Sequence, residues 1–352
     1  MSASWRAGGR LVLEHRLRVA VVGCGSQAQL AHIPALKQNP AVELAALCDT
    51  DVRKLNQLCA IHNIEKHYID FDDLKEDESI DAVIISTPNH LHAPIAVAAM
   101  RYGKDVLCEM PLGLNSSEVR QMIATAEREK RKLMPAMNTR LRPDIQTIRR
   151  FVEGGDLGEL YYCKTGWLQG RESWSLSGWR GERLRAGGGA FLSLGTPLLD
   201  AVLALLAPHE PVSVIGASHH RAQQSEVEDT AFAMIRFKPD LTLTVEVGWS
   251  MLQEKDLTYL NLFGNAGAAL LNPVQVHKEM HGHLVNVTPQ IPTKDVQRSS
   301  WRMLVNLWVE SLVRGAPAPI DAAEALTVSR LADAFYRSQS TRSEVPLTSV
   351  ES

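Results

Sequence analysis

A glycine-rich turn after the first apolar run constrains the fold of this chain more than any other segment. Residues 19–22 predict a short buried strand, and the six residues that follow read Gly23-Cys24-Gly25-Ser26-Gln27-Ala28. In this G-x-G-x-x-A spacing the first glycine permits a tight turn and the second lets backbone approach a pyrophosphate, while the small alanine lets helix and strand pack closely. A helix that starts here offers N–H groups to phosphate. We therefore expect a dinucleotide site that contains Gly23, Gly25, Ser26 and Gln27.

An acidic residue after the next predicted strand supports this interpretation. Asp49 follows residues 42–48 and lies 24 positions after Gly25. At that place a carboxylate accepts hydrogen bonds from the adenosine ribose and repels a 2′-phosphate. The expected cofactor is NAD, although the nearby Arg53 and Lys54 leave NADP open.

The chain changes its pattern of secondary structure near residue 140. Up to Ala136, short apolar runs alternate with helical patterns, which is the sequence form of a parallel sheet covered by helices. The strands expected there are residues 19–22, 42–48, 82–86, 105–108 and 133–136. After Arg142, longer strands joined by tight turns indicate an antiparallel sheet. These strands include residues 212–217, 230–238, 241–249 and 257–263, with helices expected at 301–314 and 321–338.

The predicted fold class is α/β, and the chain is expected to have three parts. Residues 1–17 form an N-terminal extension, and residues 18–137 form a Rossmann domain with a doubly wound parallel sheet. Residues 138–352 form an α+β domain with a largely antiparallel sheet for substrate binding and oligomerisation, and its terminal helices are free to pack back on the first domain. Because an uncovered antiparallel face needs burial, we expect a homodimer or homotetramer through this sheet.

Composition excludes several classes of protein and partner. With 352 residues, 45% hydrophobic and 22% charged, the chain is long enough for two folded cores. A formal net charge of −3 offers no general attraction to nucleic acid or to an anionic membrane. The five cysteines contain no C-x-x-C, so neither a disulfide framework nor a zinc module is indicated, and a cytoplasmic location fits. Residues 1–16 lack a signal-peptide pattern, and no run approaches the roughly 18 apolar residues of a membrane span.

Three further segments resemble motifs of a known oxidoreductase family. Residues 86–92 read STPNHLH, against the family pattern T-P-N-x-x-H. Residues 108–111 read CEMP, against E-K-P, and residues 187–200 read GGGAFLSLGTPLLD, against G-G-G-x-x-x-D-x-G-x-H-x-x-D. Over most of residues 18–270 the chain resembles the family of glucose-fructose oxidoreductase, inositol dehydrogenase and MocA (Gfo/Idh/MocA).

The resemblance implies a cofactor loop and a catalytic constellation that is partly replaced here. Residues assigned to the cofactor by the resemblance are Thr87, Pro88, Asn89, His92 and Glu109. In relatives the lysine of E-K-P lies near the nicotinamide and the reacting hydroxyl, and the aspartate and histidine of the glycine motif bind substrate and move its proton. This chain has Met110, Ser193 and Pro197 at those positions. Methionine has no proton to exchange, proline has no donor, and serine is a poor base without an activating neighbour.

Substitute acid–base groups are sought among the polar side chains that the motifs retain. Asp200 matches the final aspartate of the glycine motif, and His92 matches the family histidine. Each can exchange a proton with substrate or serve only the structure. A tyrosine from Tyr161 and Tyr162 is a further option.

Basic residues give a second set of candidate contacts. Trp179 and Arg180 resemble the substrate-side loop of the family, where a guanidinium can clamp a carboxylate or phosphate, although a solvated charge run is the commoner explanation. Arg140 and Arg142 allow the same two interpretations. The paired histidines lack acidic ligands at known spacing, so we expect no metal.

Three functions remain open from the sequence. The first is an NAD(P)-dependent oxidoreductase that acts on a sugar, cyclitol or related hydroxy compound through non-standard acid–base groups. The second is a non-catalytic dinucleotide or metabolite binder, such as a sensor or a partner of an active relative, which the three replaced positions favour. The third is NAD-assisted glycosidic cleavage. Because fold does not decide function, the first hypothesis depends partly on analogy.

Overall fold

The computed structural model describes residues 16–170, 178–221, 225–291 and 295–350, and the backbone of two short strands before them. The chain divides into two compact units. The first unit comprises Met1–Leu112, Ser117–Ala136 and Trp301–Ala323; the second comprises Gly113–Ser116, Met137–Ser300 and Glu324–Ser352. Of the predicted N-terminal extension, strands β1 (Ala3–Trp5) and β2 (Leu11–Leu13) pair antiparallel, while residues 1–2, 6–10 and 14–15 lie outside the described residues.

The first unit contains a six-stranded sheet in which every strand pair is parallel. Its strands are β3 (Leu17–Val22), β4 (Val42–Cys48), β5 (Lys66–Tyr68), β6 (Ala82–Ile85), β7 (Asp105–Cys108) and β8 (Leu133–Pro135). They lie in the order β5-β4-β3-β6-β7-β8, so the order reverses between β3 and β6. This doubly wound arrangement confirms the predicted fold class. Strand β5 was not predicted because it is a short, largely exposed edge strand without an apolar run.

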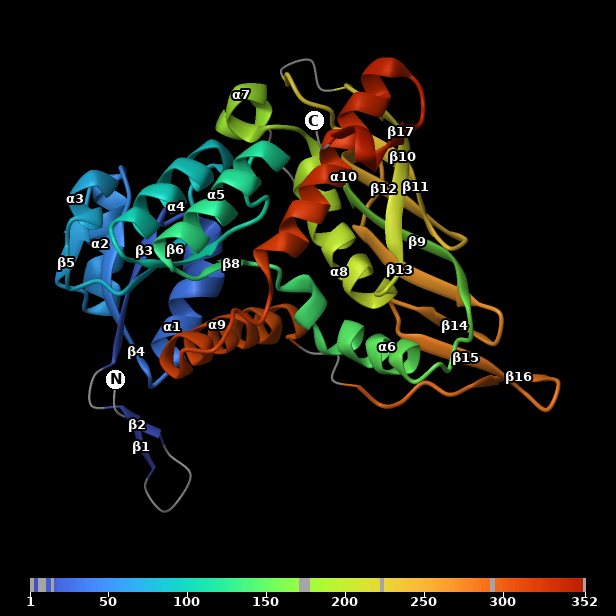
Figure 1. Ribbon diagram of the computed structural model, residues 1–352, viewed down its shortest axis with the longest axis horizontal. Helices are drawn as coiled ribbons and strands as arrows, with labels where there is room; N and C mark the ends of the chain where they lie inside the picture. The colour runs from blue at the N-terminus through green and yellow to red at the C-terminus, as the bar shows by residue number, and fades with distance from the viewer. Residues whose placement is uncertain are drawn as a thin grey trace. The chain divides into compact units, whose positions relative to one another are not determined.

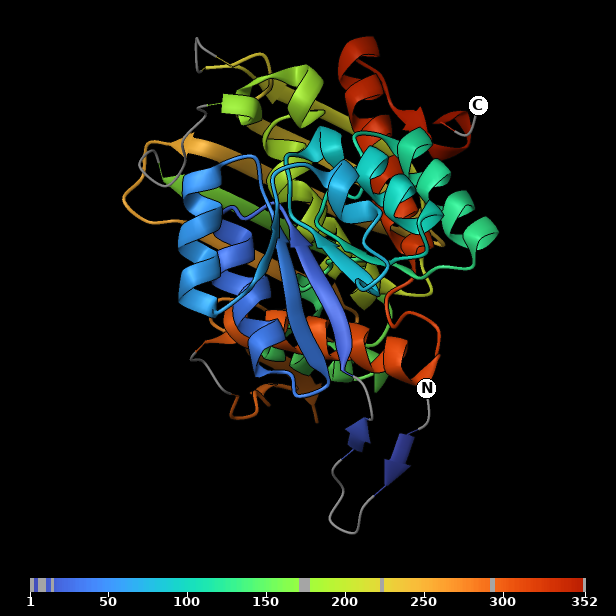
Figure 2. The same ribbon diagram turned by 90° about the vertical axis from the view of Figure 1, so that its left-hand side faces the viewer.

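Helices cover both faces of this sheet. Figure 2 shows the blue helices α1 (Ile33–Gln38) and α2 (Val52–His62) on one side of strands β3 and β4. The blue-green to green helices α4 (His92–Arg101) and α5 (Ser116–Glu129) lie on the other side. A short helix α3 (Phe71–Lys75) connects β5 to β6. Strands buried on both faces explain the continuous apolar runs that predicted them.

A helix from late in the chain belongs to the first unit. Most of α9 (Val296–Arg314) packs there: Trp301 lies edge-on to His32 with ring centroids 5.1 Å apart, and Asn306 accepts a hydrogen bond from Asn39 at 2.9 Å. The first unit is therefore assembled from segments far apart in sequence.

The second unit contains a nine-stranded sheet in the order β16-β15-β14-β13-β9-β12-β11-β10-β17. Its strands are β9 (Leu160–Gly170), β10 (Glu210–His219), β11 (Thr230–Lys238), β12 (Leu241–Met251), β13 (Leu257–Gly264), β14 (Gly267–Leu270), β15 (Gln275–Met280), β16 (His283–Asn286) and β17 (Val345–Pro346). Only β9 and β12 pair in parallel, so the sheet is largely antiparallel, as predicted. Strands β9 and β14–β17 were not among those named from the sequence.

Helices lie against one face of the second sheet. Figure 1 shows α8 (Thr196–Leu206) and α10 (Ala322–Thr341) beside it, with α6 (Pro143–Glu153) near one end. On β11, Ile235 and Phe237 are buried, whereas Phe232 and Met234 on the alternate face remain 38% and 41% exposed. We call the face that carries Phe232 and Met234 the open face.

One helical stretch corrects the sequence expectation about membrane spans. Arg183–Leu206 is long and apolar enough to qualify by length and composition alone. Its most apolar window is 78% buried inside the fold. Because most of that window is buried among other residues of the fold, the stretch is a core segment.

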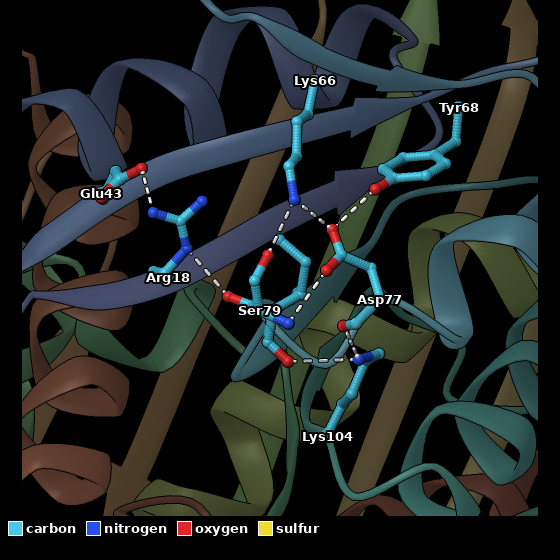
Figure 3. A network of polar contacts seen from close by, with 8 residues as sticks. Arg18, Glu43, Lys66, Tyr68, Asp77, Ser79 and Lys104 are labelled. Atoms are coloured by element: carbon cyan, nitrogen blue, oxygen red, sulfur yellow. Dashed lines mark hydrogen bonds and ion pairs between the residues drawn. The ribbon is translucent and has the colours of Figure 1, made fainter.

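A polar network joins several strands of the first unit (Figure 3). The Asp77 carboxylate accepts hydrogen bonds from Lys66 Nζ at 2.8 Å, the Tyr68 hydroxyl at 2.6 Å and the Ser79 N–H at 2.9 Å. The buried Lys104 Nζ donates to the Asp77 carbonyl at 2.8 Å. Burial alone would raise the pKa of Asp77, but the three donors outweigh it and hold the pKa well below its usual range.

We expect Asp77→Asn to lower the free energy of unfolding by about 1–3 kcal/mol at neutral pH, because a charged acceptor with three donors is lost. A depressed folded-state pKa stabilises above the unfolded value of about 4 and loses that effect as the pH falls through the folded value. Urea titrations at neutral and acidic pH should therefore show the difference shrinking in acid. Asp72→Asn, at an exposed carboxylate on α3, is the control; equal losses for both variants would contradict the prediction.

Candidate active site

The glycine-rich turn has the geometry that a dinucleotide requires. Gly23 has φ +87°, and a Cβ there would lie 2.5 Å from the Ser86 carbonyl oxygen, so only glycine fits. Nothing lies within 4 Å of the place that a Cβ on Gly25 would occupy. Ala28 is fully buried, as close packing of helix and strand requires. The turn is therefore shaped by the fold at Gly23 and open to a ligand at Gly25.

Two buried polar atoms beside this turn lack partners. Gln27 Nε2 and Thr87 Oγ1 have no hydrogen-bond partner among the described residues. Thr87 follows β6, the strand that neighbours β3. Buried polar atoms are usually paired, so two such atoms without a partner beside the glycine turn are suited to contact a bound polar ligand. These atoms and the open side of Gly25 together fit a dinucleotide.

The segment that follows the turn starts as a π-helical turn. Ala28–His32 has this form and then continues into α1. A π-helical turn widens the helix by one residue and is often found at functional sites. His32, the last residue of this turn, is fully buried.

Asp49 is held at the end of β4 by several donors. Its Oδ2 accepts a hydrogen bond from the Cys24 N–H at 2.7 Å, and its Oδ1 accepts one from the Asp51 N–H at 2.9 Å. Lys54 Nζ lies 3.1 Å from both carboxylate oxygens. The carboxylate is therefore fixed beside the glycine turn, with one cation against it.

The loop after β6 is tied to the end of β7 through His92. The ring is buried, with Nδ1 2.8 Å from the Pro111 carbonyl oxygen and Nε2 2.9 Å from that of Thr87. Burial lowers the pKa of His92, against the opposing effect of these carbonyls. Pro88 precedes the short helix Asn89–Leu91, and Asn89 is largely buried. His92 thereby links the loop after β6 to the segment that follows β7.

Sequence reasoning missed the partner of Glu109. His32 Nε2 lies 2.6 Å from Glu109 Oε1, and the Met110 N–H donates to Glu109 Oε2 at 3.3 Å. Within residues 106–113 only Glu109 and Met110 are partly exposed. The one signal for His32 in the sequence is its place in the first turns after the glycine motif, which alone does not indicate a partner.

The glycines of the second motif are required by close contacts in the second unit. A Cβ on Gly188 would lie 1.9 Å from the Tyr336 hydroxyl oxygen, and one on Gly189 would lie 1.9 Å from the Glu228 carbonyl oxygen. The buried Glu228 carboxylate accepts hydrogen bonds from the Gly189 N–H at 3.0 Å, the Phe191 N–H at 3.1 Å and the Tyr336 hydroxyl at 2.9 Å. Burial raises the pKa of Glu228, although these donors oppose it. Glu228 and Tyr336, which the sequence analysis did not identify, thus anchor the motif.

The replaced positions of this motif face outward. Within residues 188–202 only Ser193 and Pro197 are partly exposed, and they are one helical turn apart. The Ser193 hydroxyl accepts a hydrogen bond from Trp249 Nε1 at 3.0 Å. Its own proton can therefore be donated to a ligand. Pro197 lies in the first turn of α8, where proline is well tolerated.

Asp200 points the other way and is fully buried. It forms an ion pair with Arg140, whose Nη1 also pairs with Glu324 at 2.5 Å. Burial raises the pKa of Asp200, and Arg140 opposes that shift. For Arg140, burial lowers the pKa but the two carboxylates outweigh it. The structure therefore gives Asp200 a fixed partner and no exposed surface.

The remaining candidates lie apart from the glycine motif. Trp179 and Arg180 belong to the short helix Gly178–Gly181, where the guanidinium carbon lies 4.7 Å from the Trp179 ring centroid. The Tyr162 hydroxyl lies 3.1 Å from that of Thr244. Tyr161 is 57% exposed at the start of β9. Arg142 pairs with Asp144 at 2.6 Å.

No group of three or more histidine, cysteine, aspartate or glutamate side chains in the described ranges could hold a metal ion. All five cysteines are free and buried. Burial raises the pKa of Cys24 and Cys48 to about 12, so these thiols are poor nucleophiles.

Comparison with known proteins agrees with this geometry. Residues 17–137 match the family model described as an oxidoreductase family with an NAD-binding Rossmann fold, and residues 145–270 match the GFO/IDH/MocA C-terminal domain. D-glucoside 3-dehydrogenase of Escherichia coli is 26% identical over 350 residues, covering 94% of this chain and 97% of that protein. D-apiose dehydrogenase of Paraburkholderia graminis is 24% identical over 354 residues, covering 96% and 91%.

A solved structure shows the same fold. Levoglucosan dehydrogenase in complex with NADH and L-sorbose superposes with a TM-score of 0.86 at 21% identity, covering 94% of this chain and 99% of that one. The glycine turn, the strand order and the two matched domains lead to one conclusion: this chain belongs to the Gfo/Idh/MocA family of oxidoreductases, and its first unit is an NAD-binding Rossmann domain.

Proposed function

We propose that this protein is an NAD-dependent dehydrogenase that oxidises a carbinol of a sugar or a closely related polyhydroxy compound. The main support for the proposal is the cofactor cradle, by which we mean the open space at Gly25 and the adjacent unpartnered atoms of Gln27 and Thr87. The relatives named above, which act by name on D-glucosides, D-apiose and levoglucosan, support the substrate class. The buried free cysteines support a reducing cytoplasm as its location.

The first unit supplies the groups that hold the cofactor. Backbone N–H groups of the glycine turn meet the pyrophosphate, Asp49 accepts from the adenosine ribose, and the loop after β6 meets the nicotinamide side. The residues assigned to these roles are Gly23, Gly25, Ser26, Gln27, Asp49, Thr87, Pro88 and Asn89. When bound, the nicotinamide supplies the hydride acceptor. Lys54 weakens the repulsion of a 2′-phosphate by Asp49, so NAD preference over NADP is expected to be modest.

The second unit supplies polar contacts to the substrate. Ser193, oriented by Trp249, donates its proton to a sugar hydroxyl, and Trp179 with Arg180 meets the ring and its oxygens. Asp200 acts through Arg140 by holding the helix that carries Ser193, so we assign it a positioning role. His92 likewise positions the loop after β6.

The open face of the second sheet supports a homodimer or homotetramer. Ile215 and Met234 are neighbours in register across β10 and β11, and both are exposed, at 37% and 41%. Phe232 adds a third exposed apolar side chain on β11. An apolar sheet face of this kind is stabilised when a second copy covers it.

Two glycine variants test the cradle. We expect Gly25→Val to fold normally but to weaken NADH binding at least about tenfold, because the added side chain fills only the open space where phosphate binds. Gly23→Val should instead lower the free energy of unfolding by about 2–5 kcal/mol through its positive φ and the contact with Ser86. NADH fluorescence titration and thermal melts measure both effects. Normal NADH binding by Gly25→Val would refute the assigned cradle.

A sugar panel tests the reaction. We expect NAD-dependent oxidation of at least one compound among D-glucosides, D-apiose, levoglucosan and inositols. For that compound Ser193→Ala should raise KM about tenfold through the loss of one hydrogen bond of about 1–1.5 kcal/mol, with little change in NADH affinity. Ser340→Ala, an exposed serine on α10, is the control. Absence of turnover with every compound, despite NADH binding, would contradict the proposed function.

A charge on the open face tests the assembly. We expect Met234→Lys to convert the oligomer to monomers at micromolar concentration, because the substitution buries a charge in the interface. Light scattering after size-exclusion chromatography measures the mass. Leu184→Lys, at an exposed apolar residue on the short helix α7 (Arg183–Ala186), is the control. A monomeric wild-type protein would disprove the proposed assembly.

A further inference from the structure

The replacement of the usual lysine by Met110 leaves one acidic side chain at the end of β7. We propose, on the basis of the proposed function, that Glu109 is the base that accepts the hydroxyl proton of the substrate, and that His32 is its positioning residue.

Glu109 lies where the reacting end of the cofactor is expected. Its N–H donates to the Ile85 carbonyl at 3.0 Å, which fixes it beside the end of β6 and the loop that contains Thr87. In a doubly wound sheet the second half, here β6 to β8, serves the second mononucleotide. The Glu109 side chain is 14% exposed, so its carboxylate reaches the surface at this edge.

His32 orients this carboxylate from within the core. Its Nε2 lies 2.6 Å from Glu109 Oε1, while its Nδ1 has no hydrogen-bond partner among the described residues. A buried N–H without a partner is seldom tolerated, so the single proton of the neutral ring belongs on Nε2, where it is donated to Glu109. The edge contact with Trp301 holds the ring in place.

The two contacts fix the Glu109 carboxylate in one orientation. The charged carboxylate receives the His32 N–H on one oxygen and the Met110 N–H on the other. Charge-assisted hydrogen bonds of this kind are about twice as strong as neutral ones. A base that is already oriented accepts a proton without reorganisation.

Two other titratable side chains lie near Glu109, and neither is available to act as the base in its place. His92 is fully buried between the carbonyls of Thr87 and Pro111. Cys108 is also fully buried, and burial raises the pKa of its thiol well above the usual value. Among the ionisable side chains of residues 106–113, Glu109 is therefore the one that is partly exposed.

The proposed step balances as the oxidation of a carbinol to a carbonyl. The substrate C–H bond breaks and its electron pair leaves with the hydrogen as hydride, which NAD⁺ takes up. The substrate O–H bond breaks and its proton forms a bond to Glu109. The carboxylic acid then returns the proton to water at its exposed edge. A positioned base contributes roughly 10²- to 10⁴-fold to such a step.

The test compares Glu109→Ala, Glu109→Asp and His32→Phe with the wild type on a sugar that the panel identifies. We expect Glu109→Ala to lower kcat by roughly 10²- to 10⁴-fold, with sugar KM and NADH affinity changed less than about threefold. Added formate should restore part of this loss, because a small carboxylate can occupy the vacated position. Glu109→Asp should retain more activity than Glu109→Ala, and His32→Phe should lower kcat about tenfold or more without formate rescue. Glu43→Gln, at an exposed carboxylate on β4, is the control.

A second measurement does not depend on turnover. ¹⁵N NMR of the histidines should show His32 as the neutral tautomer with its proton on Nε2, and Glu109→Gln, which preserves the side-chain shape, should perturb that signal. The other tautomer would overturn the assigned pair. Wild-type kcat in Glu109→Ala, or a loss of NADH binding as large as the loss of kcat, would overturn the base while leaving the proposed function intact. A wild-type protein that binds NADH but oxidises no sugar would instead overturn the proposed function, and the base with it.

Discussion

The parallel register of the first sheet is the constraint on which the candidate site depends. At the carboxyl edge, backbone hydrogen bonds run from strand to strand: the Gly23 N–H donates to Cys48, the Ser86 N–H to Val22, the Glu109 N–H to Ile85 and the Ala136 N–H to Cys108. Each strand end is thus fixed to its neighbour before any side chain is considered. Because parallel strands end at the same edge, the glycine turn, Asp49, the Thr87 loop and Glu109 are brought to one edge of the sheet.

In the second unit, two buried carboxylates fix the glycine motif and the helix that follows it. Glu228 receives three donors and so fixes the backbone of the glycine motif, while Asp200 is neutralised by Arg140 behind the same helix. An unpaired charge at either place would cost several kcal/mol, so each requires its partners. This explains why the motif keeps its glycines and its final aspartate although Ser193 and Pro197 differ from the family pattern. The glycines and Asp200 hold the backbone of the motif in place. Ser193 and Pro197, which are partly exposed, are the positions that differ from the family pattern.

Sequence patterns predicted the elements that are apolar or conformationally unusual. The strands at residues 42–48 and 105–108 have the predicted bounds, because both are continuous apolar runs between turn residues. The edge strand β5 and the strands β14–β16 were not found, because each is short and mostly exposed or half-buried, so no buried apolar run marks it in the sequence. In the candidate site, the first glycine motif and Asp49 were predicted from spacing, and the second glycine motif from the family resemblance. His32, Trp249, Glu228 and Tyr336 were not, because each acquires its role only through a contact with a residue far along the chain.

The sequence by itself predicted the fold class and an NAD cofactor, because glycine spacing and apolar periodicity are local properties that follow from backbone geometry. The family, and the replacement of three reactive side chains, were implied by the resemblance of its motifs. Only the tertiary structure decided which remaining polar groups are available for chemistry. Asp200 and His92 are buried and paired, whereas Glu109 is oriented by His32 and partly exposed. The physical reason is that burial and pairing set the state of an ionisable group, and both depend on packing between distant segments.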